Sequence, residues 1–539
     1  MIKKITHKIT HGEKASESIT RSAVLIATMG LASRGLGLIR DRILATNFGA
    51  DDILDAYYAA FKIPDLIYNL LILGALSAAF IPVFTGLISR KHKEENLREA
   101  WNLVNTILTI GVITVGAISL LILIFSRPIV DLMAFGYSPE KRELILQMTR
   151  IMLWSPIILG ISGILGGILN SFRKFFFYSL SPIFYNLGII IGAVFLTKYF
   201  GPLGLSWGVI LGALGHLAVQ IPEVWRSGFR FVPNFNWRNK HFKKVLKLMI
   251  PRTLGIATAQ INLLAVVVIA STLESGSLAV FNFANNLQSV PLGLFGISFA
   301  VASFPVLSRL WAKEKKEQFV SELTATLRKI IFLIIPFSAL MYVLRAQIVR
   351  VILGAGKFNW EDTQLTFTAL GIFTFSLWAQ SLIPLLARAF YAIQDTKTPF
   401  LVGLLSEFLN VVLAVYLSKR YGVPGLVTAF SLTISLNAFL LYFILRRKVG
   451  GIRKKGVIKT FGKVVVATIA LVLVAQVLKT TFGAEFFGRE NTFLSVLFQL
   501  LVSIFGGLGA FMIVAQKLKI EELDYFFGII RKQFLRKTR

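Results

Sequence analysis

Two arginines and an aspartate interrupt an apolar stretch near the N-terminus of this 539-residue chain. On an α-helix, where successive residues turn by ~100°, they fall within an arc of about 120° that also holds small residues. The residues of this face are Gly30, Ser33, Arg34, Gly37, Arg40 and Asp41. Guanidinium groups bind phosphates and carboxylates through paired hydrogen bonds. An Arg34–Asp41 pair would explain one arginine, so the second indicates a face that binds an anion.

The next apolar stretch carries a second polar group. Asp55 and Lys62 are seven residues apart and share a helix face, and Pro64 leaves a backbone carbonyl that needs a polar partner or a water-filled cavity. A charge at the centre of a bilayer costs ~2.5–3.5 kcal/mol. Intramembrane charges of this kind predict a functional cavity.

Three later stretches carry further candidates. Arg252 either binds an anion or extends to the lipid headgroups, and Asn286 belongs to an amide cluster that either binds substrate or joins neighbouring helices. Glu407 and Asn410, at spacing i+3, either form a cation or proton site or pair with an arginine.

Other chemistry is absent from the sequence. The chain has no Cys, its five His lack metal-ligand spacing, and it has no Walker loop. We therefore expect no metal, no cofactor and no enzymatic activity.

The composition places these charges in a membrane protein. Hydrophobic residues make up 55% of the chain and charged residues 16%, and a soluble surface could not be built from such a sequence. Stretches of ~20 apolar residues predict fourteen transmembrane helices in an all-α polytopic protein. They lie at roughly 22–46, 55–86, 101–125, 144–170, 178–197, 203–224, 245–271, 278–308, 330–352, 364–392, 399–417, 424–445, 460–478 and 493–515.

The basic residues alternate between the two sides of these helices. Of 58 Lys and Arg, 39 lie in loops and tails on the side of the N-terminus and 9 in loops on the opposite side. The remaining 10 lie in or at the edges of the predicted helices. The positive-inside rule then places both termini in the cytoplasm. This distribution explains the net charge of +31 without nucleic acid and predicts anionic membrane lipids as partners.

An internal repeat with an offset near 220 residues divides the chain. Residues 77–84 resemble 300–307, and residues 198–205 resemble 419–426. Six helices separate the copies, so two parallel six-helix lobes and two additional C-terminal helices are expected, with a cavity at the lobe interface. The predicted parts are a tail (1–21), an N-lobe (22–224), an inter-lobe loop (225–244), a C-lobe (245–445), helices 13 and 14 (446–515) and a basic cytoplasmic tail (516–539).

Several motifs resemble the MurJ/MviN family of lipid II flippases in the MOP exporter superfamily. They are SRGLGLIRD (33–41), FGA (48–50), DAYYAAFKIP (55–64), GALSAAFIP (74–82), GILN (167–170), PLGLFG (291–296) and FYAIQDTKTP (390–399). The resemblance extends over all fourteen predicted helices. It implies that Arg34, Arg40, Asp55 and Lys62 occupy cavity positions. It also implies an undecaprenyl-pyrophosphate-linked peptidoglycan precursor as substrate.

The sequence departs from the family pattern at three positions. The family commonly has Arg, Glu and a basic residue where Tyr68, Leu73 and Asn286 stand. Either Arg252 supplies the missing charge or the cavity accepts a differently charged headgroup.

The function expected is a flippase that moves the precursor to the outer leaflet of the bacterial inner membrane by alternating access. Coupling to a monovalent cation or to the membrane potential, and cell-wall synthesis proteins as partners, are compatible with this interpretation. The alternatives are a polysaccharide-lipid or drug exporter of the superfamily, or a non-transporting scaffold of the cell-wall machinery. A drug exporter favours an acidic cavity, and a scaffold does not need two arginines in the first helix.

Overall fold

The computed structural model describes residues 12–73, 79–89, 93–451, 454–483, 492–526 and 528. This part of the chain is helical and contains no β-strand. The chain forms two compact units, unit 1 (Met1–Phe48 and Asp52–Thr272) and unit 2 (Gly49–Asp51 and Leu273–Arg539). The predicted all-helical class is confirmed. The division falls after Thr272, so these units and the lobes defined by the repeat contain different sets of helices.

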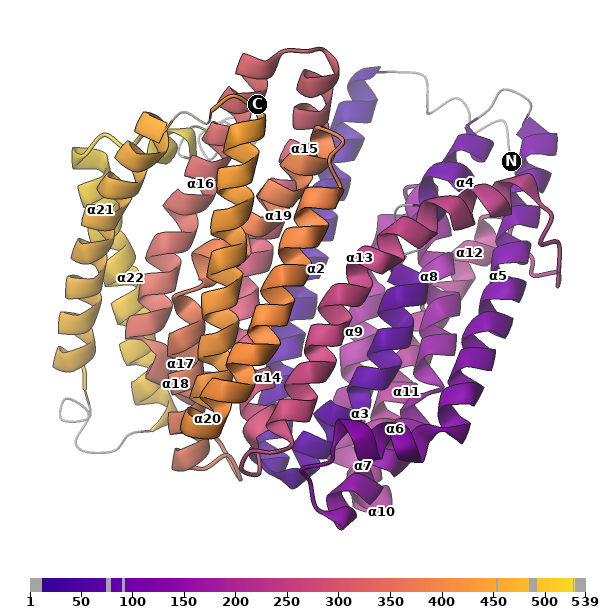
Figure 1. The fold of residues 1–539 in the computed structure, drawn as a ribbon, viewed down its shortest axis with the longest axis horizontal. Helices are drawn as coiled ribbons and strands as arrows, with labels where there is room; N and C mark the ends of the chain where they lie inside the picture. The colour runs from indigo at the N-terminus through magenta and orange to yellow at the C-terminus, as the bar shows by residue number, and fades with distance from the viewer. Residues whose placement is uncertain are drawn as a thin grey trace. The chain divides into compact units, whose positions relative to one another are not determined.

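Unit 1 is built from helices that pack in pairs, with α9 on α11, α3 on α7 and α5 on α8 (Figure 1). Its elements are α2 (Gly12–Phe48), α3 (Asp52–Tyr68), the π-helix η1 (Asn69–Leu73), α4 (Ile81–Ile88), α5 (Lys93–Ile124), α6 (Ser126–Met133), α7 (Pro139–Met152), α8 (Ser155–Ser171), α9 (Phe175–Ile191), the π-helix η3 (Gly192–Leu196), α10 (Thr197–Phe200), the 3₁₀-helix η4 (Gly201–Leu203), α11 (Gly204–Ala218), α12 (Ile221–Arg226) and α13 (Lys240–Ala270).

Unit 2 follows the same principle and ends in the α21–α22 pair, coloured yellow in Figure 1. Its elements are α14 (Ser277–Pro291), the π-helix η5 (Leu292–Ile297), α15 (Ser298–Ala312), α16 (Lys316–Val343), α17 (Arg345–Ile352), α18 (Trp360–Thr374), α19 (Leu377–Ala392), α20 (Lys397–Lys448), α21 (Lys454–Thr481) and α22 (Phe493–Lys517).

Many of these helices are long and apolar enough to cross a membrane. Eight described helices meet that condition by length and composition, or nine if α18 and α19, which meet at a bend of 46°, count as one crossing. A multi-pass membrane protein is therefore established. The number fourteen is not fixed by these criteria.

Two of the eight helices are too long for one crossing. The continuous helical run from α9 to α12 (Phe175–Arg226) and helix α20 (Lys397–Lys448) each contain 52 residues. At 1.5 Å per residue, each would extend ~78 Å if straight, against ~30 Å of hydrocarbon. In each of these two runs the chain reverses direction at a glycine with positive φ: Gly201 (+56°) in the first and Gly422 (+60°) in the second. These are the turns predicted from the Gly-Pro motifs.

Ion pairs at the ends of both long helices demonstrate the reversal. Lys174, just before the first, pairs with Glu223 near its end, and Asp395, just before the second, pairs with Lys448 at its end. In a straight helix these partners would lie tens of ångströms apart. Burial opposes ionisation of Asp395, but hydrogen bonds from Lys448 and Thr398 outweigh it and lower its pKa to about 2.

The repeat is visible in the backbone as well as in the sequence. The π-helix at Asn69–Leu73 precedes Pro82, and the π-helix at Leu292–Ile297 precedes Pro305 at the corresponding position of the second copy. Side-chain hydroxyls donate to a carbonyl of each π-helix: Thr253 to Leu70 and Ser298 to Gly293. Two copies with the same uncommon element at the same place support a duplicated fold.

The C-terminal helix pair packs against α16. Its core contains Phe332 of α16, Val464 and Leu471 of α21, and Phe511 of α22. Ile520 and Leu523, which follow α22, are buried in the same cluster. The segment after the last membrane-spanning helix is therefore attached to unit 2 at least as far as residue 526.

Candidate functional site

The Arg40 guanidinium lies in the polar face of α2 and is held from two sides. Its Nε and Nη2 donate to Asp41 Oδ1 at 3.0 and 2.8 Å, and its Nη1 donates to Asn186 Oδ1 at 3.1 Å. Asp41 is 3% exposed, and the Arg40 side chain is 22% exposed. Asp41 thus pairs with Arg40, whose side chain stays partly exposed.

Asn186 on α9 is the residue that sequence reasoning missed. Its Nδ2 donates to Pro182 O at 2.9 Å, so the side chain is fixed while its oxygen accepts from Arg40. Gly37 of α2 faces this amide, and a Cβ there would lie 4.0 Å from Asn186 Oδ1. An amide inside an apolar stretch was the available indication, but its partner is 146 residues away.

Aromatic residues of α3 lie close to this pair. Tyr57 and Tyr58 are buried, with ring centroids 5.3 Å apart, and both are within electrostatic range of the Arg40 guanidinium. The environment strengthens charge interactions at the guanidinium, because screening falls as water is removed.

The rest of the α2 face is more open. Arg34 is exposed and Ser33 half-buried, and a Cβ added at Gly30 would meet no atom within 4 Å. Ser33 and Arg34 are therefore accessible, and their role in binding stays a prediction.

Asp55 has a different environment from the one expected. It is fully buried, and Lys141 Nζ of α7 donates to its Oδ2 at 2.9 Å and to Asp52 Oδ1 at 2.6 Å. The same ammonium lies 3.8 Å from the centroid of the Tyr137 ring. Lys62, two helical turns further along α3, is half-buried and lies within electrostatic range of Asp65. Asp55 thus stabilises the α3–α7 contact, whereas Lys62 keeps some exposure.

The candidates in later helices are distributed over several elements. Arg252 lies on α13, but its side chain is outside the described residues. Asn286 on α14 is half-buried. Within the same helix Gln288 Nε2 donates to Asn285 Oδ1 at 3.0 Å, and Gln380 Nε2 of α19 donates to Gln288 Oε1 at 2.9 Å, which joins the two helices. Part of the amide cluster therefore joins neighbouring helices, which is one of the two alternatives that the sequence left open.

Glu407 and Asn410 lie on the first half of α20. Glu407 is half-buried and Asn410 is 3% exposed. Among the described residues, no group of three or more His, Cys, Asp or Glu side chains could hold a metal ion. A cation site here would use fewer than three such side chains, together with neutral oxygens.

A family profile described as "Lipid II flippase MurJ" matches residues 44–515, which is most of the chain. The chain belongs to the MurJ family. Two similar relatives carry the description "probable lipid II flippase MurJ". The protein from Vibrio cholerae is 32% identical over 443 residues, covering 79% of this chain and 83% of that one. The protein from Buchnera aphidicola subsp. Acyrthosiphon pisum is 29% identical over 517 residues, covering 95% and 99%.

Solved structures agree with this assignment. A lipid II flippase MurJ in an inward closed conformation matches with a TM-score of 0.74 and 25% identity, covering 92% of this chain and 99% of that one. An inward-facing MATE family multidrug resistance transporter of the MOP superfamily matches with a TM-score of 0.64 at 15% identity, covering 80% and 99%. Because the MATE transporter is only 15% identical, its similarity shows a shared fold alone. The family assignment predicted from the motifs is confirmed.

Proposed function

We propose that this chain is a lipid II flippase, which carries the lipid-linked peptidoglycan precursor from the inner to the outer leaflet of the cytoplasmic membrane for cell-wall biosynthesis. Membership of the MurJ family over residues 44–515 is the observation that carries the proposal. The protein acts as a transporter, and alternating access moves the headgroup while the prenyl chain stays in lipid.

The α2 face supplies the chemistry for such a substrate. A pyrophosphate needs cationic hydrogen-bond donors, and a guanidinium offers two in one plane. Asp41 and Asn186 fix the plane of the Arg40 guanidinium, so less conformational freedom is lost on binding. Arg34 and Ser33 offer further polar groups on the same helix, and Lys62 and Arg252 are proposed to add positive charge. Asn286 is proposed as a neutral substrate contact.

The proposed topology has fourteen crossings with both termini in the cytoplasm. Each 52-residue helix reverses and provides two crossings, and α18 with α19 provides one. The remaining three crossings are α2, the α3–α4 segment and α13. Their polar residues lower their hydropathy, so criteria of length and apolarity do not select them. The distribution of Lys and Arg supports the orientation in the inner membrane.

Energy coupling is proposed to use Glu407 and Asn410 or the membrane potential. One carboxylate and one amide at i+3 suit a proton or a monovalent cation better than a divalent metal. Anionic lipids, and cell-wall synthesis proteins that use the exported precursor, are proposed as partners.

Depletion with complementation tests the function. A bacterium depleted of its own flippase should accumulate precursor in the inner leaflet, and this chain should restore precursor that an externally added lipid II-cleaving enzyme can reach. Protein that is abundant in the membrane but leaves the precursor inaccessible would contradict the proposal. An inactive Arg40→Ala variant at equal abundance is the matched control.

A further inference from the structure

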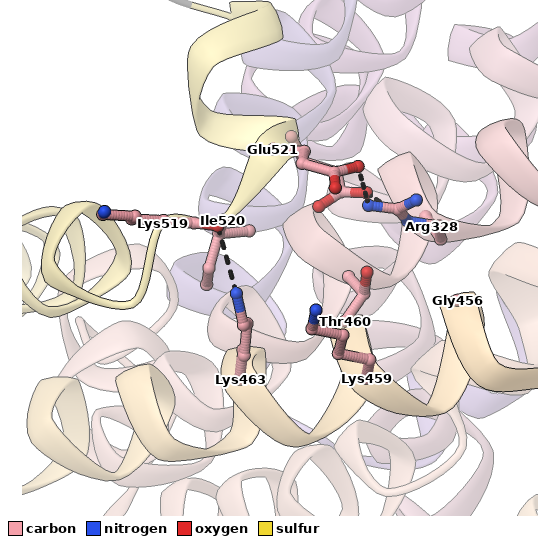
Figure 2. A pocket seen from close by; sticks show the side chains of 9 residues that line it. Arg328, Gly456, Lys459, Thr460, Lys463, Lys519, Ile520 and Glu521 are labelled. Atoms are coloured by element: carbon pink, nitrogen blue, oxygen red, sulfur yellow. Dashed lines mark hydrogen bonds and ion pairs between the residues drawn. The ribbon is translucent and has the colours of Figure 1, made fainter.

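A small polar pocket lies where the C-terminal helix pair meets α16 (Figure 2). Its walls are the first turns of α21, the residues that follow α22, and Arg328 of α16. α21 and α22 are both candidate membrane crossings. The start of one and the end of the next share one end of the bundle, so the pocket is at the level of the lipid headgroups.

Two of its basic side chains are used to hold the chain together. Arg328 Nη2 lies 2.6 Å from Glu521 Oε2, and its Nε lies 2.5 Å from Glu522 Oε1. Lys463 Nζ donates to Leu518 O at 2.6 Å and to Lys519 O at 3.1 Å, which caps the end of α22.

Lys459 is the basic side chain that remains for a ligand. It is exposed, its ammonium points toward the pocket in Figure 2, and it has no hydrogen-bond partner among the described residues. The hydrogen bond from Arg328 lowers the pKa of Glu521, and the charges of Lys459 and Lys463 contribute to this shift. Lys459 therefore faces the carboxylates from across the pocket. Lys519 also lines the pocket, but its ammonium points away from it in Figure 2. The other three basic side chains, set against Glu521 and Glu522, leave one positive charge in excess.

Glu522 supplies an independent indication of a ligand. Its side chain is 6% exposed, and its Oε2 is buried without a hydrogen-bond partner in the described structure. A buried carboxylate oxygen without a donor is costly. The volume open to the centre of a water molecule is ≈ 70 Å³, and one water needs only about 10–15 Å³ by the same measure. The space suits a group larger than one water.

Exposed apolar side chains lie beside the pocket on α21. Ile458 and Phe461, on either side of Lys459, are exposed. A polar pocket beside exposed apolar side chains matches the two parts of a lipid.

We propose that this pocket binds the head of a phospholipid whose phosphodiester carries a hydrogen-bond-donating group. The phosphodiester contacts Lys459 and compensates the single excess positive charge. A hydroxyl or ammonium of the head donates to Glu522 Oε2, and the acyl chains lie against the exposed Ile458 and Phe461. Phosphatidylglycerol and phosphatidylethanolamine share this chemistry. Phosphatidylcholine has the phosphodiester but no donor.

Native mass spectrometry of the purified full-length protein tests the site. Phosphatidylglycerol, phosphatidylethanolamine and phosphatidylcholine with identical acyl chains are added separately. The wild type should retain at least one of the first two about fivefold better than phosphatidylcholine, and Lys459→Gln should reduce this retention by about fivefold. Lys519→Gln is the matched control, because it removes the same charge from a side chain that points away from the pocket in Figure 2. It should change retention by less than about twofold.

Glu522→Gln tests the donor contact and should remove the discrimination against phosphatidylcholine. If that variant fails to fold, Lys459→Gln still decides, because its exposed side chain contributes little to the fold. Equal retention of all three lipids by the wild type, or wild-type retention by Lys459→Gln, would overturn the proposal. Competition by soluble glycerophosphoglycerol as strong as by the lipid would overturn its lipid part. The measurement needs no transport, so its result is independent of the flippase proposal.

Discussion

The Arg40 guanidinium is a charge that the protein has oriented before any ligand binds. Asp41 neutralises part of this charge and Asn186 fixes the plane of the guanidinium, while the Arg40 side chain stays partly exposed. A lysine would carry the same charge without the planar pair of donors. Arg40 and Asp41 could be predicted from the sequence because charges in an apolar helix are conspicuous. Asn186 could not, because an uncharged amide gains meaning only from a tertiary contact.

Arg40→Ala and Arg34→Ala should abolish precursor export without removing the protein from the membrane, and Arg40→Lys should be intermediate. Asn186→Leu should reduce export by about tenfold or more, because a hydrogen bond to a charged group contributes ~1.5–3 kcal/mol. Export is measured as precursor accessible at the outer leaflet. Gln147→Leu, which removes an exposed amide of α7, is the control. Full export by Asn186→Leu would show that Asp41 alone orients the arginine.

Asp55 shows how a charged residue with a cavity-like pattern can have a structural environment. It shares a helix face with Lys62 in sequence, yet its carboxylate is buried against Lys141. The sequence places Lys141 in a loop, just before the helix predicted at 144–170, where a basic residue attracts no notice. Helix periodicity predicts on which side of a helix a residue lies. It does not predict which residue of another helix packs against that side.

Lys141→Met should destabilise unit 1 strongly, since it leaves the fully buried Asp55 without its cation. Losses of about 3–5 kcal/mol are typical when one partner of a buried pair is removed. The neighbouring Arg142→Met breaks a partly exposed pair with Asp131, which should matter by about 1 kcal/mol or less. Thermal unfolding in detergent compares the two. Equal unfolding temperatures would contradict the assignment, and Lys141→Met with Asp55→Asn should recover part of the loss.

Among the helices, the reversals at Gly201 and Gly422 depend on close backbone contact. Three residues after each turn, a Cβ at Gly204 would lie 2.6 Å from Thr197 Cα, and a Cβ at Gly425 would lie 2.5 Å from Leu417 C. Contacts below 3.0 Å with backbone cannot be relieved by a side-chain rotation. The sequence predicted these turns well, because glycine and proline mark them directly.

Gly425→Ala should therefore lower the folded yield, and Gly403→Ala should not. Both glycines lie on α20, and a Cβ at Gly403 meets no atom within 4 Å. The monodisperse fraction in size-exclusion chromatography measures the effect. A yield of Gly425→Ala equal to that of Gly403→Ala would mean that the two halves of α20 can separate without cost.

At the scale of the whole chain, the repeat accounts for features that no single helix explains. The copies share the glycine turns, the π-helix before a proline and an ion pair that closes each long helix, with the charges exchanged between Lys174–Glu223 and Asp395–Lys448. Duplicated sequence predicted duplicated structure. The number of crossings was harder to establish, because α2, α3 and α13 carry the polar residues proposed to serve transport and so look less like membrane helices.

Topology provides the prediction for the entire molecule. The loop at 225–244 is proposed to be cytoplasmic because it is among the most basic, and the loop at 353–363 is proposed to face the other side because it has a single Lys. An exposed position exists in each, Arg238 and Lys357. The chain has no native Cys, so one introduced Cys reports one site.

An impermeant thiol reagent applied to intact spheroplasts should label Lys357→Cys and leave Arg238→Cys unlabelled until the membrane is opened. The reason is electrostatic: basic loops are retained on the cytoplasmic side during insertion. The helices predicted at 245–271, 278–308 and 330–352 lie between the two loops, and an odd number of crossings puts them on opposite sides. Labelling of both positions in intact spheroplasts, at equal protein abundance, would mean that one of these helices does not cross. Labelling of Arg238→Cys alone would mean that the orientation is inverted.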